Sequence, residues 1–498
     1  MIRRVLIANR GEIARRVIRT CRAMNIKTVA VFSEADADTP HVREADEAVG
    51  LGRAPATESY LNISKVIDAA RRTAADAVHP GYGFLSENPA FVEACEAAGL
   101  IFVGPPGSVL REMGSKTGTR AAVAKAGVPV VPGATPRSQE SSAIGASIRE
   151  VGLPVMLKAS GGGGGKGMRI VRRQEEIDGA IESARGEARR SFGNDALYVE
   201  RLIERARHVE VQIFADRQGN AVHLFERDCT LQRRHQKVIE EAPAPTLTDA
   251  LRDRLTQAAL KVARTVGYVN AGTVEFLVDE SGNGEPDFYF LEMNTRLQVE
   301  HPITEAITGL DLVRAQLQVA DGEPLPFRQA DIGINGHAIE CRVYAEDPER
   351  LLPQSGRLLR YREPAGDGIR VDSGVVQGQQ ITVHYDPLIA KLIVHAPTRT
   401  EAIDRLLDAI GRFTILGIRH NLSFLSALLR RAEVASNTTH TRFIEEHLGE
   451  LVTRPDPALR QTAAAIAARL ATSEPVPVEQ DQSTAAFDPW QTLGPVRW

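Results

Sequence analysis

Short apolar runs alternate with amphipathic helical patterns over the first hundred residues, and this alternation restricts the possible folds more than any other feature. Helical spacing over Glu12–Met24 and Asn88–Ala98 predicts two helices. The apolar runs predict strands at Arg4–Ala8, Lys27–Phe32, Asp76–His79 and Leu100–Val103. Strands that recur with helices between them form a parallel sheet covered on both faces. The turn Ala8–Glu12 has one glycine where a dinucleotide-binding turn has three, which argues against a nicotinamide cofactor.

The rest of the chain has a different organisation. Two apolar runs, Leu153–Lys158 and Met168–Val171, flank a glycine loop and predict a flap. Residues Val209–Val299 are rich in strand patterns, and a third block from Gly336 combines short strands with a helix-rich part, Thr400–Leu429. A length of 498 residues suggests about three domains. We therefore expect a multidomain protein with α/β and α+β parts.

Charge and cysteine usage exclude several classes of protein. The chain has 60 Lys and Arg against 64 Asp and Glu, which gives no reason to expect a nucleic-acid or membrane partner. Its four cysteines lie far apart, which argues against a disulfide framework or a thiolate zinc site. No run of 18 apolar residues occurs, and the N-terminal apolar run is too short for a signal peptide. These features predict a cytoplasmic location.

The glycine run Gly161–Gly167 is the first candidate site. Glycines allow close backbone approach and expose N–H donors, and Lys158 and Lys166 add positive charge, so the loop is suited to a polyphosphate. The alternative is a flexible linker. It is not a Walker A loop, because no Gly-Lys-Ser or Gly-Lys-Thr follows.

A predicted hairpin carries the second candidate site. Strands over Gly272–Asp279 and Asp287–Asn294 flank a turn at Ser281–Gly284, and a turn centred between Asn283 and Gly284 places Glu275 opposite Glu292. Facing carboxylates need neutralisation, and oxygen ligands of this kind suit Mg²⁺. In the alternative register one glutamate points to water.

Two charged segments are further candidates. In extended geometry Arg296, Gln298 and Glu300 share one face and could hold a small oxyanion and remove its proton, although a solvated edge strand with an internal salt bridge is the alternative. The segment Glu226–Lys237 contains many charged residues in a short run. Considered alone, this run predicts a solvated loop, in which Cys229 would be a small buried residue.

Taken together, six segments resemble biotin carboxylase, the ATP-grasp component of the biotin-dependent carboxylases. The resemblance covers about residues 1–445 in collinear order, and it favours the functional interpretation of each candidate site. The segments are Met1–Gly11, His79–Asn88, Lys158–Met168, Glu226–Lys237, Glu292–Pro302 and Gly336–Arg342.

The resemblance implies a Rossmann-like N-terminal domain over 1–113, an ATP-grasp domain over 114–330 with a mobile lid at about 130–204, and a C-terminal β-rich domain over 331–446. ATP and bicarbonate would form carboxyphosphate, and its carboxyl group would pass to biotin as the first half-reaction of an acyl-CoA carboxylase complex. The chain has no Met-Lys-Met biotin-attachment tripeptide. We therefore expect a separate biotin carboxyl carrier protein, separate carboxyltransferase subunits and a homodimer, with 447–498 as a helical or linker tail that could dock a partner.

The resemblance also implies roles for individual residues. Catalysis would fall to Glu300 as the base, to Arg342, which stabilises the biotin enolate, and to Arg296 and Lys237. Bicarbonate would be bound by Lys237, Arg296, Gln298, Val299 and Glu300, biotin by Tyr82 and Arg342, and Mg²⁺ or Mn²⁺ by Glu275, Glu292 and Asn294. The expected ATP contacts are Lys116, Lys158, Gly163, Gly164, Gly165, Lys166, Glu200, Ile203, His208, Gln232, His235, Glu275 and Glu292.

Two other classes of function compete with this expectation. Another ATP-grasp ligase, of the carbamoyl-phosphate or purine-pathway type, would share the flap and the metal glutamates but not the segments at His79–Asn88 and Arg342. A silent nucleotide-binding scaffold would be free to lose Glu300, which this chain retains.

Overall fold

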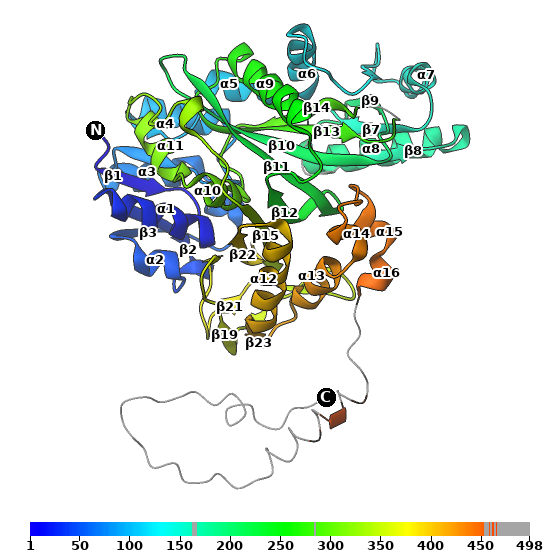
Figure 1. The fold of residues 1–498 in the computed structure, drawn as a ribbon. Coiled ribbons are helices and arrows are strands. Elements are labelled where there is room, and N and C mark those ends of the chain that lie inside the picture. Colours follow the sequence, from blue (N-terminus) through cyan, green and yellow to red (C-terminus); the bar gives the residue numbers. More distant parts are fainter. Residues whose placement is uncertain (162–166, 283–284, 453–457, 459–460, 463–464, 466–498) are drawn as a thin grey trace, which may run out of the picture.

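The computed structural model describes residues 1–161, 167–282 and 285–452, together with positions 458, 461, 462 and 465. Three connected parts follow one another along the chain (Figure 1). The first is a parallel α/β sheet, the second contains a long antiparallel sheet and a smaller one beside it, and the third extends the long sheet and packs helices against it. This mixed architecture confirms the fold class expected from the sequence.

The N-terminal part is a five-stranded sheet in the order β3-β2-β1-β4-β5, with every neighbouring pair parallel. The strands are β1 (Arg4–Ile7), β2 (Lys27–Ser33), β3 (Glu47–Gly52), β4 (Ala77–His79) and β5 (Ile101–Phe102). The helices are α1 (Gly11–Ala23), α2 (Pro40–Glu44), α3 (Ile63–Arg72), α4 (Pro89–Ala97) and α5 (Gly107–Gly114). Strand β3 was not predicted, because it is an edge strand in which only Val49 and Leu51 are buried.

The long sheet has eight strands in the order β14-β13-β10-β11-β12-β15-β22-β20, all antiparallel to their neighbours. Its first five strands in chain order are β10 (Ala206–Ala215), β11 (Ala221–Arg233), β12 (Gln236–Ala242), β13 (Asn270–Asp279) and β14 (Asp287–Asn294). The others are β15 (His337–Tyr344), β20 (Ile369–Ser373) and β22 (Leu388–Ala396). Because β12 pairs with β15, the middle and C-terminal parts share one continuous sheet.

A long helix interrupts the segment that the sequence pattern predicts as strand-rich. Helix α9 (Asp249–Thr265) packs on β10 and β11. Its Thr248 side chain caps the first turn by accepting from the Leu251 N–H, and Leu251, Leu255 and Val262 recur at helical spacing on its buried face. The prediction that residues 209–299 are rich in strands is therefore wrong over helix α9, residues 249–265.

A smaller antiparallel sheet, in the order β6-β9-β7-β8, lies over one end of the long sheet (Figure 1). Its strands are β6 (Gly133–Ala134), β7 (Val155–Ala159), β8 (Arg169–Val171) and β9 (Leu197–Arg201). Helices α7 (Ser141–Val151) and α8 (Ile177–Phe192) pack on it, whereas α6 (Lys116–Lys125) packs on α5, α9 and β14. The smaller sheet has its own apolar core, which includes Ile144, Leu157 and Leu197. Strands β7 and β8 pair directly, as the flap prediction requires.

The C-terminal part packs helices against β15 and β22 and ends in short elements. The helices after β14 are α10 (His301–Thr308), α11 (Leu312–Ala320), α12 (Arg399–Arg412), α13 (Leu422–Leu429), α14 (Ala432–Ala435), α15 (Phe443–Glu446) and α16 (Leu448–Leu451). Three two-stranded pairs complete it: β16 (Glu346–Asp347) with β17 (Leu352–Pro353), β18 (Gly356–Arg357) with β21 (Gln380–Ile381), and β19 (Arg360–Arg362) with β23 (Thr414–Leu416). The predicted tail begins with α16, and beyond position 452 it lies almost entirely outside the described residues. Over the described part of the chain, no helix is long and apolar enough to cross a bilayer.

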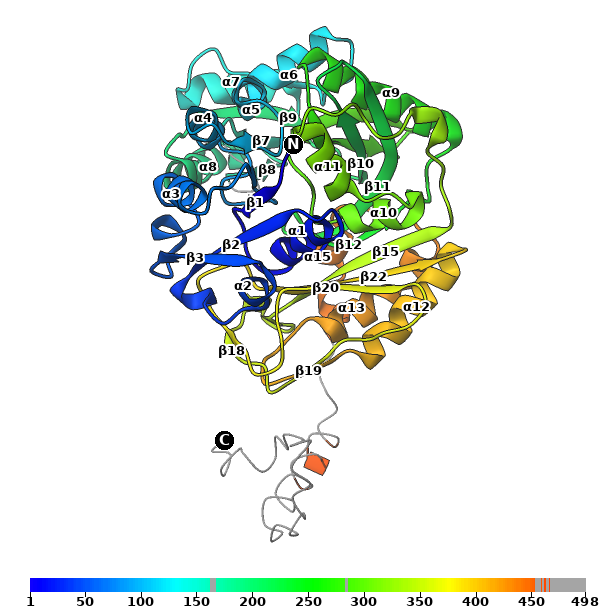
Figure 2. The ribbon, with the colours of Figure 1, turned by 90° about the vertical axis from the view of Figure 1, so that its left-hand side faces the viewer.

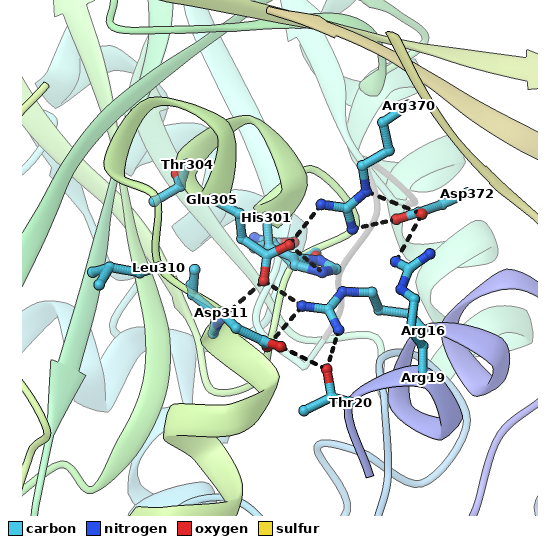
Figure 3. Close-up of polar contacts among 12 residues, drawn as sticks. Arg16, Arg19, Thr20, His301, Thr304, Glu305, Leu310, Asp311, Arg370 and Asp372 are labelled. Carbon is cyan, nitrogen blue, oxygen red and sulfur yellow. Dashed lines mark hydrogen bonds and ion pairs between the residues drawn. The ribbon is translucent and has the colours of Figure 1, made fainter. Parts of the chain in front are cut away.

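A buried ionic seam joins the three parts. Helix α1 packs beside β20, and Figure 2 shows the N-terminal elements against these C-terminal strands. Arg16 of α1 lies 2.5 Å from Glu305 of α10 and 2.8 Å from Asp311. Glu305 also lies 2.8 Å from Arg370 of β20, which pairs with Asp372 at 2.6 Å (Figure 3). Each buried charge in this seam therefore has a partner from another part of the chain.

Candidate active site

A cavity of about 900 Å³ lies between the long sheet, the smaller sheet and helix α15. Most of the side chains singled out from the sequence converge on it, although they come from distant segments. Those that line it are Lys158, Glu200, Ile203, His208, Gln232, His235, Lys237, Glu275, Glu292, Asn294, Arg296, Gln298, Val299 and Arg342. The sequence therefore predicted 14 of the residues that line this cavity.

Lys237 is the central cation of the cavity. Its Nζ donates to Glu210 at 2.5 Å, to Glu275 at 2.8 Å and to Glu300 at 2.7 Å. Burial alone would lower the pKa of Lys237, but the three carboxylates outweigh burial and raise it well above its usual value. Lys237 is therefore a fixed positive charge.

The hairpin of β11 and β12 presents this lysine. Its two turn residues, Arg234 and His235, both have positive φ, +48° and +64°, as a type I′ turn requires. The register then pairs Gln232 with Lys237, so both side chains line the cavity. Glu226–Lys237 is thus largely buried sheet, and the solvated-loop alternative is wrong.

In the hairpin of β13 and β14, Glu275 lies directly opposite Glu292 as predicted, although the turn residues 283 and 284 lie outside the described residues. The predicted register does not hold nearer the turn, because a bulge between Glu275 and Phe276 shifts it by one residue and pairs Phe276 with Phe290. Glu275 accepts from Lys237, lies 3.0 Å from His208 Nε2 and accepts from the Asn294 amide at 2.8 Å. Burial raises the pKa of Glu275, but Lys237 and His208 outweigh burial and bring it well below its usual value. Two carboxylates and an amide facing one cavity are a donor set that suits Mg²⁺ or Mn²⁺.

Glu300 is fully buried and contacts two residues that line the cavity, Lys237 and Arg342. It accepts from Lys237 at 2.7 Å on one oxygen and from Arg342 Nη2 at 3.0 Å on the other. Burial raises the pKa of Glu300, but Lys237, Arg342 and nearby Arg227 outweigh it and hold the pKa well below its usual value. Glu300 is therefore an anion that faces two cations.

The segment that follows β14 does not have the extended geometry used to predict its shared face. Strand β14 ends at Asn294, residues 299–300 form a turn, and α10 begins at His301. Pro302 explains the change, because proline lacks an N–H and is favoured in the first turn of a helix. The extended interpretation is therefore wrong, as is the edge-strand alternative.

The side chains of this segment nevertheless converge. Arg296 Nη1 donates to Gln298 at 2.9 Å, and its Nε lies 3.1 Å from Glu87. Gln298 donates in turn to Glu275 at 3.2 Å. A cation, an amide and a carboxylate thus meet at one wall, where a small oxyanion could be held.

The nucleotide side of the cavity is built from the smaller sheet. Lys158 Nζ lies 2.5 Å from Glu200, and Arg120 lies 2.7 Å from the other oxygen of Glu200. Ile203 and His208 are buried at the same wall. Of the other predicted ATP contacts, Gly163, Gly164, Gly165 and Lys166 lie outside the described residues, and the side chain of Lys116, at the start of α6, is not described.

Tyr82 does not line the cavity. Its hydroxyl donates to Glu12, which lies 3.3 Å from Lys391 Nζ, and Lys391 lies opposite Arg342 in the sheet. All four cysteines are buried, and the burial of Cys229 agrees with its prediction as a small buried residue. Burial raises the pKa of Cys229 well above its usual value, so it is a neutral thiol.

The sequence interpretation missed several residues of the site. Glu210 pairs with Lys237 and Arg227, and Glu240 accepts from Arg342 Nε at 2.6 Å. The sequence did contain a signal for Glu210. It lies two residues after His208 in a predicted strand, so the two side chains are expected on the same face. Glu87 lies inside a segment that carries the family resemblance, but no pattern showed that it faces Arg296.

Comparisons with known proteins agree with this geometry. Family models match consecutive regions: the biotin carboxylase N-terminal domain over residues 1–110, the ATP-binding domain of the carbamoyl-phosphate synthase L chain over 115–328, and the biotin carboxylase C-terminal domain over 340–446. Biotin carboxylase 2 of Bacillus subtilis is 50% identical over 90% of this chain and 100% of its own length. The mitochondrial methylcrotonoyl-CoA carboxylase subunit alpha of rat is 51% identical over 91% of this chain, but the match spans only 63% of its length.

Solved structures show the same similarity. A biotin carboxylase–β,γ-ATP complex from Campylobacter jejuni has a TM-score of 0.87 at 42% identity, covering 90% of this chain and 99% of that one. The biotin carboxylase domain dimer of Hydrogenobacter thermophilus 2-oxoglutarate carboxylase, solved with MgADP and bicarbonate, also has a TM-score of 0.87, at 43% identity over 92% of this chain and 100% of that one.

Proposed function

The chain belongs to the biotin carboxylase family, and from this premise we propose that it carboxylates the biotin of a separate carrier protein, using ATP and bicarbonate. The observation that carries the proposal is Glu300, a buried carboxylate between Lys237 and Arg342, two cations that line the cavity. Activation of bicarbonate requires a base with a cation beside it, and activation of biotin then requires a second cation that stabilises an anion. Glu300 has both cations, Lys237 and Arg342, within hydrogen-bond reach.

In the first step Glu300 takes the proton of bicarbonate, which Arg296, Gln298 and Val299 hold. The freed carbonate oxygen attacks the γ-phosphorus of ATP, the bond to the ADP oxygen breaks, and carboxyphosphate forms. Holding a poor nucleophile in line with the phosphate removes most of the entropy cost of the encounter. Lys237, with its raised pKa, offsets the charge that spreads over the transferred group.

ATP is bound by the residues that line the nucleotide side of the cavity. Lys158, Glu200, Ile203, His208, Gln232 and His235 line it, and Lys116, Gly163, Gly164, Gly165 and Lys166 are proposed to complete it. Glu275, Glu292 and Asn294 would hold Mg²⁺ or Mn²⁺, which supplies positive charge at the phosphate oxygens when bound. The smaller sheet would act as a lid that excludes water from the mixed anhydride.

In the second step carboxyphosphate breaks into CO₂ and phosphate, and the phosphate takes the N1 proton of biotin. The biotin nitrogen then forms a C–N bond to CO₂. Arg342 stabilises the enolate oxygen that develops, and Tyr82 supports the biotin side. Arg342 is suited to this role because Glu240 and Glu300 hold its guanidinium in place.

The chain spans 63% of the length of the rat relative, so that relative contains further segments. The larger enzyme in which this chain acts is therefore also a proposal. Because several relatives are α subunits of acyl-CoA carboxylases, we propose a complex with a biotin carboxyl carrier protein and carboxyltransferase subunits, a homodimer like the domain dimer noted above, and a cytoplasmic location.

The segment 447–498 would dock a partner. Truncation at residue 475 should weaken co-purification with partner subunits while phosphate release is kept, and unchanged co-purification would contradict the docking role.

The test of the proposed reaction is bicarbonate-dependent phosphate release from ATP and Mg²⁺, with and without free biotin. Release should rise with biotin in the wild type and collapse in Arg342→Ala and Glu300→Ala. Arg252→Ala is the matched control, since Arg252 pairs with buried Glu226 and does not line the cavity. If biotin changes nothing and neither variant matters, another ATP-grasp ligase becomes the better interpretation.

A further inference from the structure

Lys391 is a fully buried lysine that the proposed reaction does not use. It lies on β22, and its Nζ donates to the Val299 carbonyl at 2.6 Å and lies 3.3 Å from Glu12 Oε1. Burying an unpaired ammonium has a high free-energy cost. Both contacts of Lys391 therefore restrict the positions of their partners, the Val299 carbonyl and the Glu12 carboxylate. These groups come from the loop before α10 and from α1, so Lys391 bridges all three parts of the chain.

The sheet register places Lys391 between two charged residues. Arg342 of β15 lies directly beside it on one strand, and Asp372 of β20 lies beside it on the other. Asp372 is already engaged by Arg370 at 2.6 Å and by Arg19 at 3.0 Å, as Figure 3 shows. No hydrogen bond joins Lys391 to Asp372 among the described residues, and the ammonium is directed to Val299 and Glu12 instead.

The contact with Val299 acts on the peptide that precedes the proposed base. The Val299 carbonyl belongs to the peptide unit that joins Val299 to Glu300. Because a peptide is planar, holding this oxygen also orients the Glu300 N–H and restricts both flanking residues. Lys391 therefore limits where the Glu300 carboxylate and the Val299 backbone can lie in the bicarbonate pocket.

The second contact acts on the biotin side. Glu12 is buried, with one oxygen shared between the Tyr82 hydroxyl and Lys391. Tyr82 is thereby tied to the same ammonium as the Val299 carbonyl. One side chain thus connects the groups proposed to meet the two substrates that must react with each other.

We propose that Lys391 is a positioning residue of this reaction, which holds the Val299–Glu300 peptide and the Glu12–Tyr82 pair in register with each other. The inference rests on the proposed function and deepens it. Lys391 is not among the residues that line the cavity, and it acts through Val299 on the bicarbonate side and through Glu12 on the biotin side.

The experiment is bicarbonate-dependent phosphate release by the full chain, with KM for bicarbonate, KM for free biotin and kcat measured separately. Lys391→Met removes both contacts and should raise the KM for bicarbonate about tenfold, the cost of losing one hydrogen bond from a charged donor. Glu12→Gln removes the ion pair but keeps the lysine on Val299. It should raise the KM for biotin and change the KM for bicarbonate by less than about twofold.

Two controls separate positioning from loss of stability. Arg16→Gln removes a buried cation from the ionic seam, and Lys27→Met breaks the exposed ion pair of Lys27 with Asp46. Arg16→Gln should lower the unfolding temperature without changing the KM for bicarbonate, and Lys27→Met should change neither. Should Lys391→Met fail to fold, Lys391→Arg is measured in its place, because it keeps the charge but displaces the donor.

Equal KM values for bicarbonate in Lys391→Met and wild type, or the same increase in Arg16→Gln, would overturn the positioning role. The proposed function has a separate outcome. If the wild type releases no phosphate in response to bicarbonate, the proposed reaction fails, whereas failure of the Lys391 inference leaves wild-type turnover intact.

Discussion

Replacing the proposed base isolates one proton transfer. Glu300→Gln keeps the size of the side chain and one hydrogen-bond acceptor but cannot take a proton. A positioned general base contributes about 10²- to 10⁴-fold to a rate, so bicarbonate-dependent phosphate release should fall by that factor, or about 3 to 5 kcal/mol in the barrier.

The cost in stability should be much smaller than this loss of rate. Removing one partner of a buried ion pair costs about 3 to 5 kcal/mol when the other charge is stranded. Here Lys237 keeps Glu210 at 2.5 Å and Glu275 at 2.8 Å, and Arg342 keeps Glu240 at 2.6 Å. Because each cation keeps at least one carboxylate partner in Glu300→Gln, we expect the free energy of unfolding to fall by about 1 to 2 kcal/mol.

The assay combines turnover, nucleotide binding and unfolding in one set of variants. Phosphate release is measured against bicarbonate concentration, MgADP affinity by calorimetry and stability by urea denaturation. Glu226→Gln is the matched control, because Glu226 is equally buried and pairs with Arg252 at 3.0 Å outside the cavity. Turnover of Glu300→Gln within about threefold of the wild type would refute the assignment of Glu300 as the base.

Three further predictions concern the metal, pH and the backbone. Glu292→Gln should raise the Mg²⁺ concentration for half-maximal phosphate release about tenfold, and a chelator should abolish wild-type turnover; an unchanged Mg²⁺ requirement would contradict the ligand role. Burial lowers the pKa of His41 to about 4 in the folded protein, so between pH 6.5 and 4 the unfolded chain binds more protons and the free energy of unfolding falls by about 3 kcal/mol as pH drops. His41→Asn should flatten that slope in urea denaturation, and an unaltered slope would exclude His41 as its source. Gly417→Ala should lower the unfolding temperature, because Gly417 has φ +103° and an added Cβ would lie 2.1 Å from the Arg357 carbonyl oxygen; Gly449→Ala, with no atom within 4 Å, is the control that should change little.

Local patterns were enough wherever a repeat of two or 3.6 residues decides the structure. The strand and helix alternation predicted β1, α1, β2, α4 and the parallel sheet. Counting outward from the turn at Asn283–Gly284 predicted the pairing of Glu275 with Glu292, but the bulge between Glu275 and Phe276, which also sets this pairing, has no signal in the alternation. Collinear motifs also identified 14 of the side chains that line the cavity.

The sequence interpretation failed at one local signal and wherever a distant partner decides the contacts of a charge. Arg296–Glu300 was expected to be extended, but Pro302 starts α10 there and the chain turns. Glu240 and Lys391 have no local signal, because a charged residue in a strand is ordinarily expected to face water. Only tertiary pairing makes them buried ions with defined partners.

What the sequence by itself determined is therefore the fold class, the family and the chemical types gathered at the cavity. What only the tertiary structure decided is which charges meet: Glu300 between Lys237 and Arg342, and Lys391 between Val299 and Glu12. The physical reason is that periodicity reports which face of an element is buried, whereas the partner of a buried charge is set by strands and loops that lie 42 or more residues apart in the chain.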